Sequence, residues 1–132
     1  MMASYWPTPA AQTNDPVVSE KMNTTHKLVF SRTLEKAEWQ NTRLIKEHFA
    51  EEMQKLKKQT GKDMIIFGSS DLAVTFIGHG LIDEFRVMVN PLVLGDGKSL
   101  FKGIKEKLDL KLIKTRTFKN GNVLLYYEPK VQ

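Results

Sequence analysis

The chain has 132 residues, 41% of them hydrophobic and 27% charged, so it can form one domain with its own core and is neither collagen nor a low-complexity chain. It contains no cysteine, which excludes disulfide scaffolds, zinc–thiolate sites and thiol nucleophiles and fits a cytoplasmic protein. The net charge of +5 allows an anionic partner such as nucleic acid, or is simply a mildly basic surface.

Residues 1–16 contain three prolines among small and polar residues and predict an irregular lead-in, because proline fixes φ and disfavours helix at the residue before it. They lack the charged and apolar regions of a secretory signal, and no apolar run in the chain approaches the ~20 residues that cross a bilayer. Val17–Asn23 then predicts a short helix, with Asp15 as its N-cap and Pro16 in its first position.

Lys27–Phe30 is a short apolar run that predicts a buried strand ending in a polar loop, while Leu34–Asn41 favours no single structure. Thr42–Gln59 has helical periodicity and predicts the longest helix. Four apolar residues would share one face of this helix: Ile45, Phe49, Met53 and Leu56.

Met64–Phe67 is apolar without alternation, as expected of a second strand buried on both faces. After a Gly-Ser-Ser turn, Asp71–His79 predicts a short helix. Glu84–Val89 predicts a third strand, which Pro91 ends, and Leu92–Gly97 predicts a loop.

Alternating leucines at 108, 110 and 112 have strand periodicity. Asn120-Gly121 is a strong hairpin signal and joins Lys114–Lys119 to Val123–Tyr127. Strands that alternate with helices and end in a hairpin predict a single α/β sandwich with a mixed sheet and a C-terminal antiparallel pair.

The turn at Gly68-Ser69-Ser70 leads from a predicted strand directly into a predicted helix. Glycine admits a ligand close to the backbone, and the N-terminus of a helix offers free N–H groups to a diphosphate. The alternative is a plain strand-to-helix turn in which Ser70 or Asp71 caps the helix.

A second candidate for phosphate binding is Ser31-Arg32-Thr33, at the carboxyl end of the first predicted strand. Ligands of open α/β sheets favour that edge, and an arginine can hold a phosphate with two parallel hydrogen bonds. The alternative is a solvated loop.

Two further charged groups have weaker claims. Asp83-Glu84 is either a proton-transfer pair or two solvent-facing acids, and the second interpretation is favoured. Lys98–Lys119 carries eight basic residues against two acids and is either a nucleic-acid face or, as favoured, a solvated one. The three histidines are scattered without metal-ligand spacing, so no metal site is predicted.

Taken together, the motifs resemble the dihydrofolate-reductase-like family that includes the reductase domain of bacterial riboflavin biosynthesis. The resemblance covers nearly the whole chain. It rests on six segments in order: Leu28–Leu34, Trp39–Thr42, Leu56–Asp63, Ile65–Leu72, Gly80–Arg86 and Asn90–Phe101.

The resemblance implies a three-layer α/β sandwich with a mostly parallel sheet, and an NADPH-dependent reductase acting on a small heterocyclic, pterin- or pyrimidine-like substrate. By this analogy Ser31, Arg32 and Thr33 would meet the adenosine 2′-phosphate, and Phe30 before them would also bind the cofactor. The residues of the diphosphate turn are Gly68, Ser69, Ser70, Asp71 and Leu72. The Gly95-Asp96-Gly97 loop would lie near the nicotinamide or the substrate. The resemblance also implies a homodimer, with no membrane and no nucleic acid, and it identifies no proton donor.

Two departures qualify this expectation. Many relatives have a Gly-Gly pair at the diphosphate turn, where this chain has Phe67-Gly68-Ser69. Relatives also begin upstream with strands that this chain is expected to lack, which predicts a rearranged sheet, strand exchange between protomers, or a longer parent chain. A catalytically inactive nucleotide-binding or interaction module of the same fold is therefore the alternative function.

Overall fold

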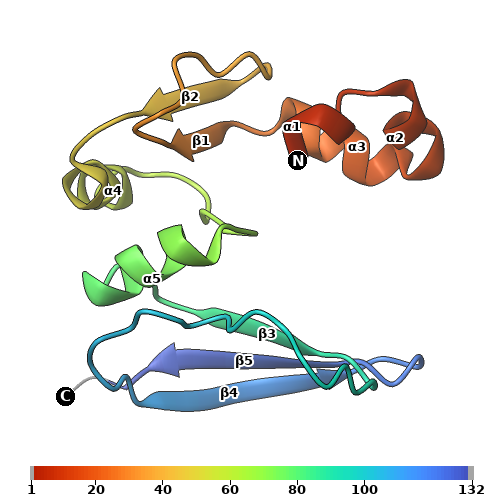
Figure 1. The fold of residues 1–132 in the computed structure, drawn as a ribbon, viewed down its shortest axis with the longest axis vertical. Helices are drawn as coiled ribbons and strands as arrows, with labels where there is room; N and C mark the ends of the chain where they lie inside the picture. The colour runs from red at the N-terminus through yellow and green to blue at the C-terminus, as the bar shows by residue number, and fades with distance from the viewer. Residues whose placement is uncertain (1, 131–132) are drawn as a thin grey trace. The chain divides into compact units, whose positions relative to one another are not determined.

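The computed structural model describes residues 2–130; residue 1 and residues 131–132 lie outside the described part. The chain divides into two compact units, one ending at Glu52 and the other beginning at Met53, and each is described by itself. Groups of helices and groups of strands follow one another along the chain, and the strands form both parallel and antiparallel pairs, which confirms the predicted mixed α/β fold (Figure 1). That the units form one domain without the family's N-terminal strands stays a prediction.

The first unit begins with helices rather than with the predicted irregular lead-in. These are α1 (Met2–Tyr5) and α2 (Pro9–Asn14). The prediction was wrong because the prolines start helices here instead of interrupting them. Pro9 lies in the first turn of α2, where no intrahelical N–H is needed, and the Thr8 hydroxyl accepts from Ala11 N at 3.2 Å.

The predicted short helix is confirmed as α3 (Pro16–Thr24). As expected, Asp15 is its N-cap and accepts from Val18 N at 3.2 Å. Proline again occupies the first turn.

The strand predicted at Lys27–Phe30 is confirmed as β1. Its partner is β2 (Thr42–Ile45), which runs parallel to it with Lys27 opposite Thr42 and Phe30 opposite Ile45. The prediction of one helix from Thr42 to Gln59 was therefore wrong in its first part, and the helix α4 covers only Phe49–Lys57.

The physical reason is long-range pairing. Ile45, with 5% of its surface exposed, is buried as the last residue of a strand and not on a helix face. Asn41 and His48, at φ 57° and 51°, lie in the left-handed region on either side of β2 and so interrupt any helix through it.

In the second unit, Met64–Phe67 forms no strand, which corrects the prediction of a buried one. Ile65 is 63% exposed and Phe67 is 72% exposed. A strand exists only where a neighbour satisfies its backbone, and no strand of the described residues pairs with this segment.

The predicted helix after it is confirmed as α5 (Ser70–Gly78), with Phe76 fully buried. The next expected strand is also confirmed, as β3 (Phe85–Val89), and residues 92–97 form a loop as predicted. Phe85 is buried, and its ring lies edge-on to Phe101 with 6.3 Å between centroids.

The C-terminal hairpin is confirmed, with β4 (Leu110–Thr117) and β5 (Val123–Pro129) joined through Asn120-Gly121. Both β3 and β4 pair antiparallel with β5, which is the central strand of this sheet (Figure 1). The described strands form two sheets, one with a parallel pair and one with two antiparallel pairs.

Candidate functional site

The carboxyl end of β1 is the first candidate site. Ser31 N donates to Ile45 O at 3.0 Å, which extends the pairing of β1 and β2 by one residue. The Ser31 hydroxyl accepts from Leu34 N at 3.1 Å and so folds the chain into a turn. This turn places Arg32 and Thr33 on the surface.

Arg32 is held by a ring and not by a carboxylate. Its guanidinium carbon lies 5.5 Å from the centre of the Phe49 ring. Within the described residues no acid pairs with Arg32, whereas Arg43 of the neighbouring strand pairs with Glu52 at 2.9 Å. The five N–H groups of Arg32 are therefore available to an anion, which a planar guanidinium can grip with two parallel hydrogen bonds.

The start of α5 is the second candidate site. Ser69 is the N-cap, and its hydroxyl accepts from Leu72 N at 3.4 Å, so the expectation that Ser70 or Asp71 would cap was wrong. The backbone N–H groups of Ser70 and Asp71 thus open the helix, where its dipole favours negative charge. A side chain added at Gly68 would meet open space, so a ligand has room at the turn.

The structure groups the predicted residues by unit. Phe30–Thr33 belong to the first unit, where one turn brings them together, and Gly68–Leu72 belong to the second, where they form the start of α5. Asp71 is an acidic residue in the first turn of α5, and its exposed carboxylate would oppose an anion bound there.

Asp83 and Glu84 each pair with a different cation. Lys57 Nζ pairs with Asp83 and also donates to Leu81 O at 3.0 Å, while Glu84 pairs with Arg86. This neighbouring carboxylate raises the pKa of Arg86. These separate ion pairs favour the interpretation of two solvent-facing acids over a proton-transfer pair.

The basic stretch at Lys98–Lys119 has internal partners for half of its eight cations. Four of its cations have one: Lys107 with Asp109, Lys111 with Glu128, Lys114 over the ring of Tyr126, and Arg116 over that of Phe118. Lys107 also lowers the pKa of Asp109 from its usual 3.8. These contacts favour the solvated face over a nucleic-acid interface.

The Gly95-Asp96-Gly97 loop is exposed, and Asp96 Oδ1 accepts from Gly97 N at 2.7 Å. Among residues 2–130, no three histidine, aspartate or glutamate side chains gather where they could hold a metal. Nor does any helix in that range have the length and apolar character needed to cross a bilayer.

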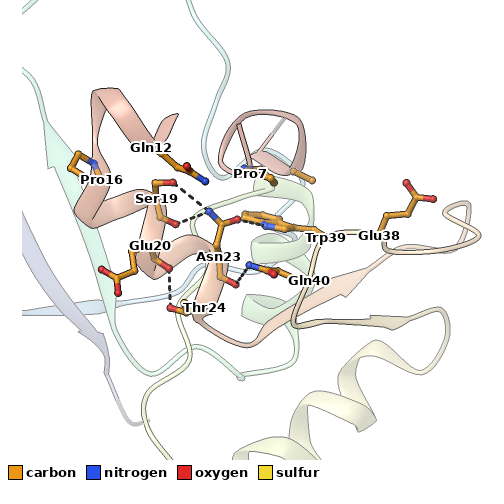
Figure 2. Close-up of a pocket in the computed structure, with 11 residues that line it drawn as sticks. Pro7, Gln12, Pro16, Ser19, Glu20, Asn23, Thr24, Glu38, Trp39 and Gln40 are labelled. Atoms are coloured by element: carbon orange, nitrogen blue, oxygen red, sulfur yellow. Dashed lines mark hydrogen bonds between the residues drawn. The ribbon is translucent and has the colours of Figure 1, made fainter. Parts of the chain in front are cut away.

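A pocket of about 810 Å³ lies in the first unit, between its helices and the segment at Glu38–Gln40 (Figure 2). Asn23 lies at its centre. The amide nitrogen of Asn23 donates to Trp6 O at 2.9 Å and Ser19 O at 2.8 Å, and its amide oxygen accepts from Trp39 Nε1 at 2.8 Å. These central polar groups already form hydrogen bonds within the chain, so they favour a role in stabilising the first unit over a role in ligand binding. This pocket was not predicted from the sequence.

Lys27 caps the C-terminal end of α3. Its ammonium donates to Met22 O at 3.0 Å and Thr25 O at 2.9 Å, and it lies 4.5 Å from the centre of the Trp39 ring. Burial lowers the pKa of Lys27 from its ordinary value of 10.5.

Comparison with known proteins assigns the family. The family described as the RibD C-terminal domain matches residues 1–124. Two proteins of Bacillus subtilis (strain 168), both named as uncharacterized, are similar in sequence. YyaP is 46% identical over 76% of this chain and 53% of its own length, and YwjB is 36% identical over 55% of this chain and 41% of its own length. The chain thus spans about half the length of the curated relatives it matches.

The fold is shared with a protein of Shewanella sp. PV-4 that is provisionally named a riboflavin biosynthesis protein. Its crystal structure matches with a TM-score of 0.72 at 21% identity, over 91% of this chain and 71% of that one. That likeness shows the fold alone, while the sequence match to the family covers nearly all of the chain. The chain therefore belongs to the RibD C-terminal domain family.

Proposed function

We propose that the chain binds NADPH and takes part in the transfer of a hydride to a small heterocyclic, pterin- or pyrimidine-like substrate. One observation carries the cofactor assignment. Arg32 presents an exposed guanidinium, without an acidic partner among the described residues, at the carboxyl end of a strand in a RibD C-terminal domain. An anion held there would be the 2′-phosphate that distinguishes NADPH from NADH.

Each unit carries one candidate anion site, and each site is proposed by itself. In the first unit Arg32 binds the 2′-phosphate, with the hydroxyls of Ser31 and Thr33 as further donors. In the second unit the N–H groups at the start of α5 are the candidate for a diphosphate, at the turn that begins with Gly68. Bound NADPH supplies the hydride, and the chain's own residues bind and orient it.

The two sites fit these anions to different degrees. At β1 the guanidinium is free of carboxylates in the described part of the chain, so an incoming phosphate displaces no ion pair. At α5 the helix end and the open space around Gly68 favour an anion, but the charge of Asp71 offsets part of that gain. The Arg32 site is accordingly the better test of the proposal.

The second candidate function is a nucleotide-binding module without turnover. Asp83 and Glu84 were the one acid pair considered for proton transfer in the sequence analysis. Both are engaged in ion pairs, and this favours a module without turnover. NADPH binding without oxidation across a panel of carbonyl, imine and pterin substrates would support it. Oxidation of NADPH with any of them would support the reductase.

The experiment is a titration with NADPH and NADH, followed by the fluorescence of Trp6 and Trp39. We expect NADPH to bind more tightly, and Arg32→Ala to weaken NADPH by about ten- to a hundredfold while leaving NADH nearly unchanged, since hydrogen bonds to charged groups contribute about 1.5–3 kcal/mol. Arg86→Ala is the control, because it removes a guanidinium that is already paired with Glu84 and that belongs to the other unit from Arg32 and Phe49.

Equal weakening of NADPH and NADH by Arg32→Ala would contradict the 2′-phosphate role. By the same family resemblance we propose a homodimer, which sedimentation of the whole chain would test.

A further inference from the structure

Phe49 is the first residue of α4 and contacts the candidate site from outside the sequence segment that defines it. Its ring lies 5.5 Å from the guanidinium carbon of Arg32. It also meets the ring of Phe30 edge-on, with 5.4 Å between centroids and an interplanar angle of 74°. Phe49 is thus held by one aromatic neighbour from β1 while it holds a cation from the turn that follows β1.

The position of Phe49 is itself supported. Glu52, one turn further along α4, pairs with Arg43 of β2 at 2.9 Å. Its N–H donates to His48 O at 2.9 Å, so the helical turn begins directly at the end of the segment that follows β2. The first turn of α4 is therefore tied to β2, which pairs with β1 along its whole length.

An exposed arginine side chain populates many rotamers. When an anion binds it, the loss of this rotamer freedom costs up to about 2 kcal/mol of binding free energy. An aromatic face within ~6 Å attracts the guanidinium and reduces that freedom before the anion arrives. Arg43 shows the other way to hold an arginine, by a carboxylate, which would compete with a phosphate. A ring restrains Arg32 without neutralising it.

We propose that Phe49 is a positioning residue that holds the Arg32 guanidinium for the 2′-phosphate and thereby increases the preference for NADPH over NADH. This inference rests on the proposed function, since it assigns to Phe49 part of the selectivity of the same site. Phe49 touches Arg32 and would act through it.

The test compares two probes, 2′,5′-ADP and 5′-AMP, which differ in the 2′-phosphate, by calorimetric titration of the whole chain. For Phe49→Leu we expect the preference for 2′,5′-ADP to fall by about two- to fivefold, which is the range of an exposed cation–π contact. Phe49→Tyr keeps the aromatic face and should retain the wild-type preference for 2′,5′-ADP over 5′-AMP. Phe101→Leu is the control, because it removes a ring in edge-on contact with another phenylalanine but with no role at Arg32.

Arg32→Ala separates the two hypotheses. If it abolishes the preference and Phe49→Leu lowers it, with no further loss in the double variant, the proposal is supported. If Arg32→Ala abolishes the preference and Phe49→Leu leaves it unchanged, Phe49 has no positioning role and the proposed function stands. If Arg32→Ala leaves the preference intact, or the wild type shows none, both proposals are overturned.

A loss of stability in Phe49→Leu would lower the affinity for both probes together, so only the ratio of the two affinities counts as evidence. If the ratio of affinities in Phe49→Tyr is as low as in Phe49→Leu, the loss of preference is due to packing and the proposal is overturned.

Discussion

Asn23 connects three parts of the first unit through one side chain. Its amide nitrogen donates to the carbonyl oxygen of Trp6. Figure 2 shows the other two bonds, in which the amide donates to Ser19 O and accepts from the indole of Trp39. Ser19 is itself buried, and its hydroxyl donates to Trp6 O at 3.1 Å. At the residue scale, this network orders the helical segment against the chain before β2.

We expect Asn23→Ala to lower the free energy of unfolding by about 2 kcal/mol, because it leaves several part-buried donors and acceptors without partners. Urea unfolding followed by tryptophan fluorescence would measure the change. Asn14→Ala, an exposed asparagine at the end of α2, is the control and should have little effect. Equal stability of the two variants would show that the network contributes nothing net.

At the residue scale the candidate site was only half predictable. Arg32 could be found from sequence, because a guanidinium directly after an apolar strand lies where α/β proteins bind ligands. Its contact with Phe49 could not, since the periodicity assigned Phe49 to the apolar face of a longer helix. Only the pairing of β1 with β2 brings that ring to the turn after β1.

At the element scale, the hairpin between β4 and β5 depends on its turn. Gly121 has φ +87°, in the left-handed region, and a Cβ there would lie 3.2 Å from Pro91 Cγ. A side chain at this position is therefore disfavoured for two reasons, the strain of the backbone conformation and the close contact with Pro91. Gly97 has neither restriction.

We expect Gly121→Ala to reduce the free energy of unfolding by about 1–3 kcal/mol, the cost of a strained backbone position. Gly97→Ala, in the exposed loop before β4, should change it by less than about 0.5 kcal/mol. Thermal unfolding of both variants would measure the difference. A Gly121→Ala protein as stable as the wild type would mean that the turn relaxes freely.

At the scale of the whole molecule, the excess of basic residues raises the question of nucleic acid. In the sheet of β3, β4 and β5, two cations lie over the ring of Tyr126. The guanidinium carbon of Arg86 is 5.4 Å from the ring centre, and the ammonium nitrogen of Lys114 is 4.4 Å from it. A ring flanked by two cations offers little surface for stacking a base, which single-strand binding generally uses.

We therefore expect the chain to bind a labelled oligothymidine only weakly, with a shallow dependence of log K on log salt, in fluorescence anisotropy at several salt concentrations. Counterion release from many phosphate contacts would instead give a steep slope of about −0.7 per contact for a single strand. A steep slope with tight binding at low salt would contradict the prediction and favour a nucleic-acid function.

The sequence by itself determined the elements whose signals are local. The cap at Asp15, the apolar run of β1, the helix after Ser69 and the Asn-Gly hairpin each depend on a few adjacent residues, and the structure has all four. The tertiary structure alone decided the segments at Thr42–Ile45 and Met64–Phe67. Whether such a segment becomes a strand depends on a distant partner for its backbone, which the first has in β1 and the second lacks among the described residues.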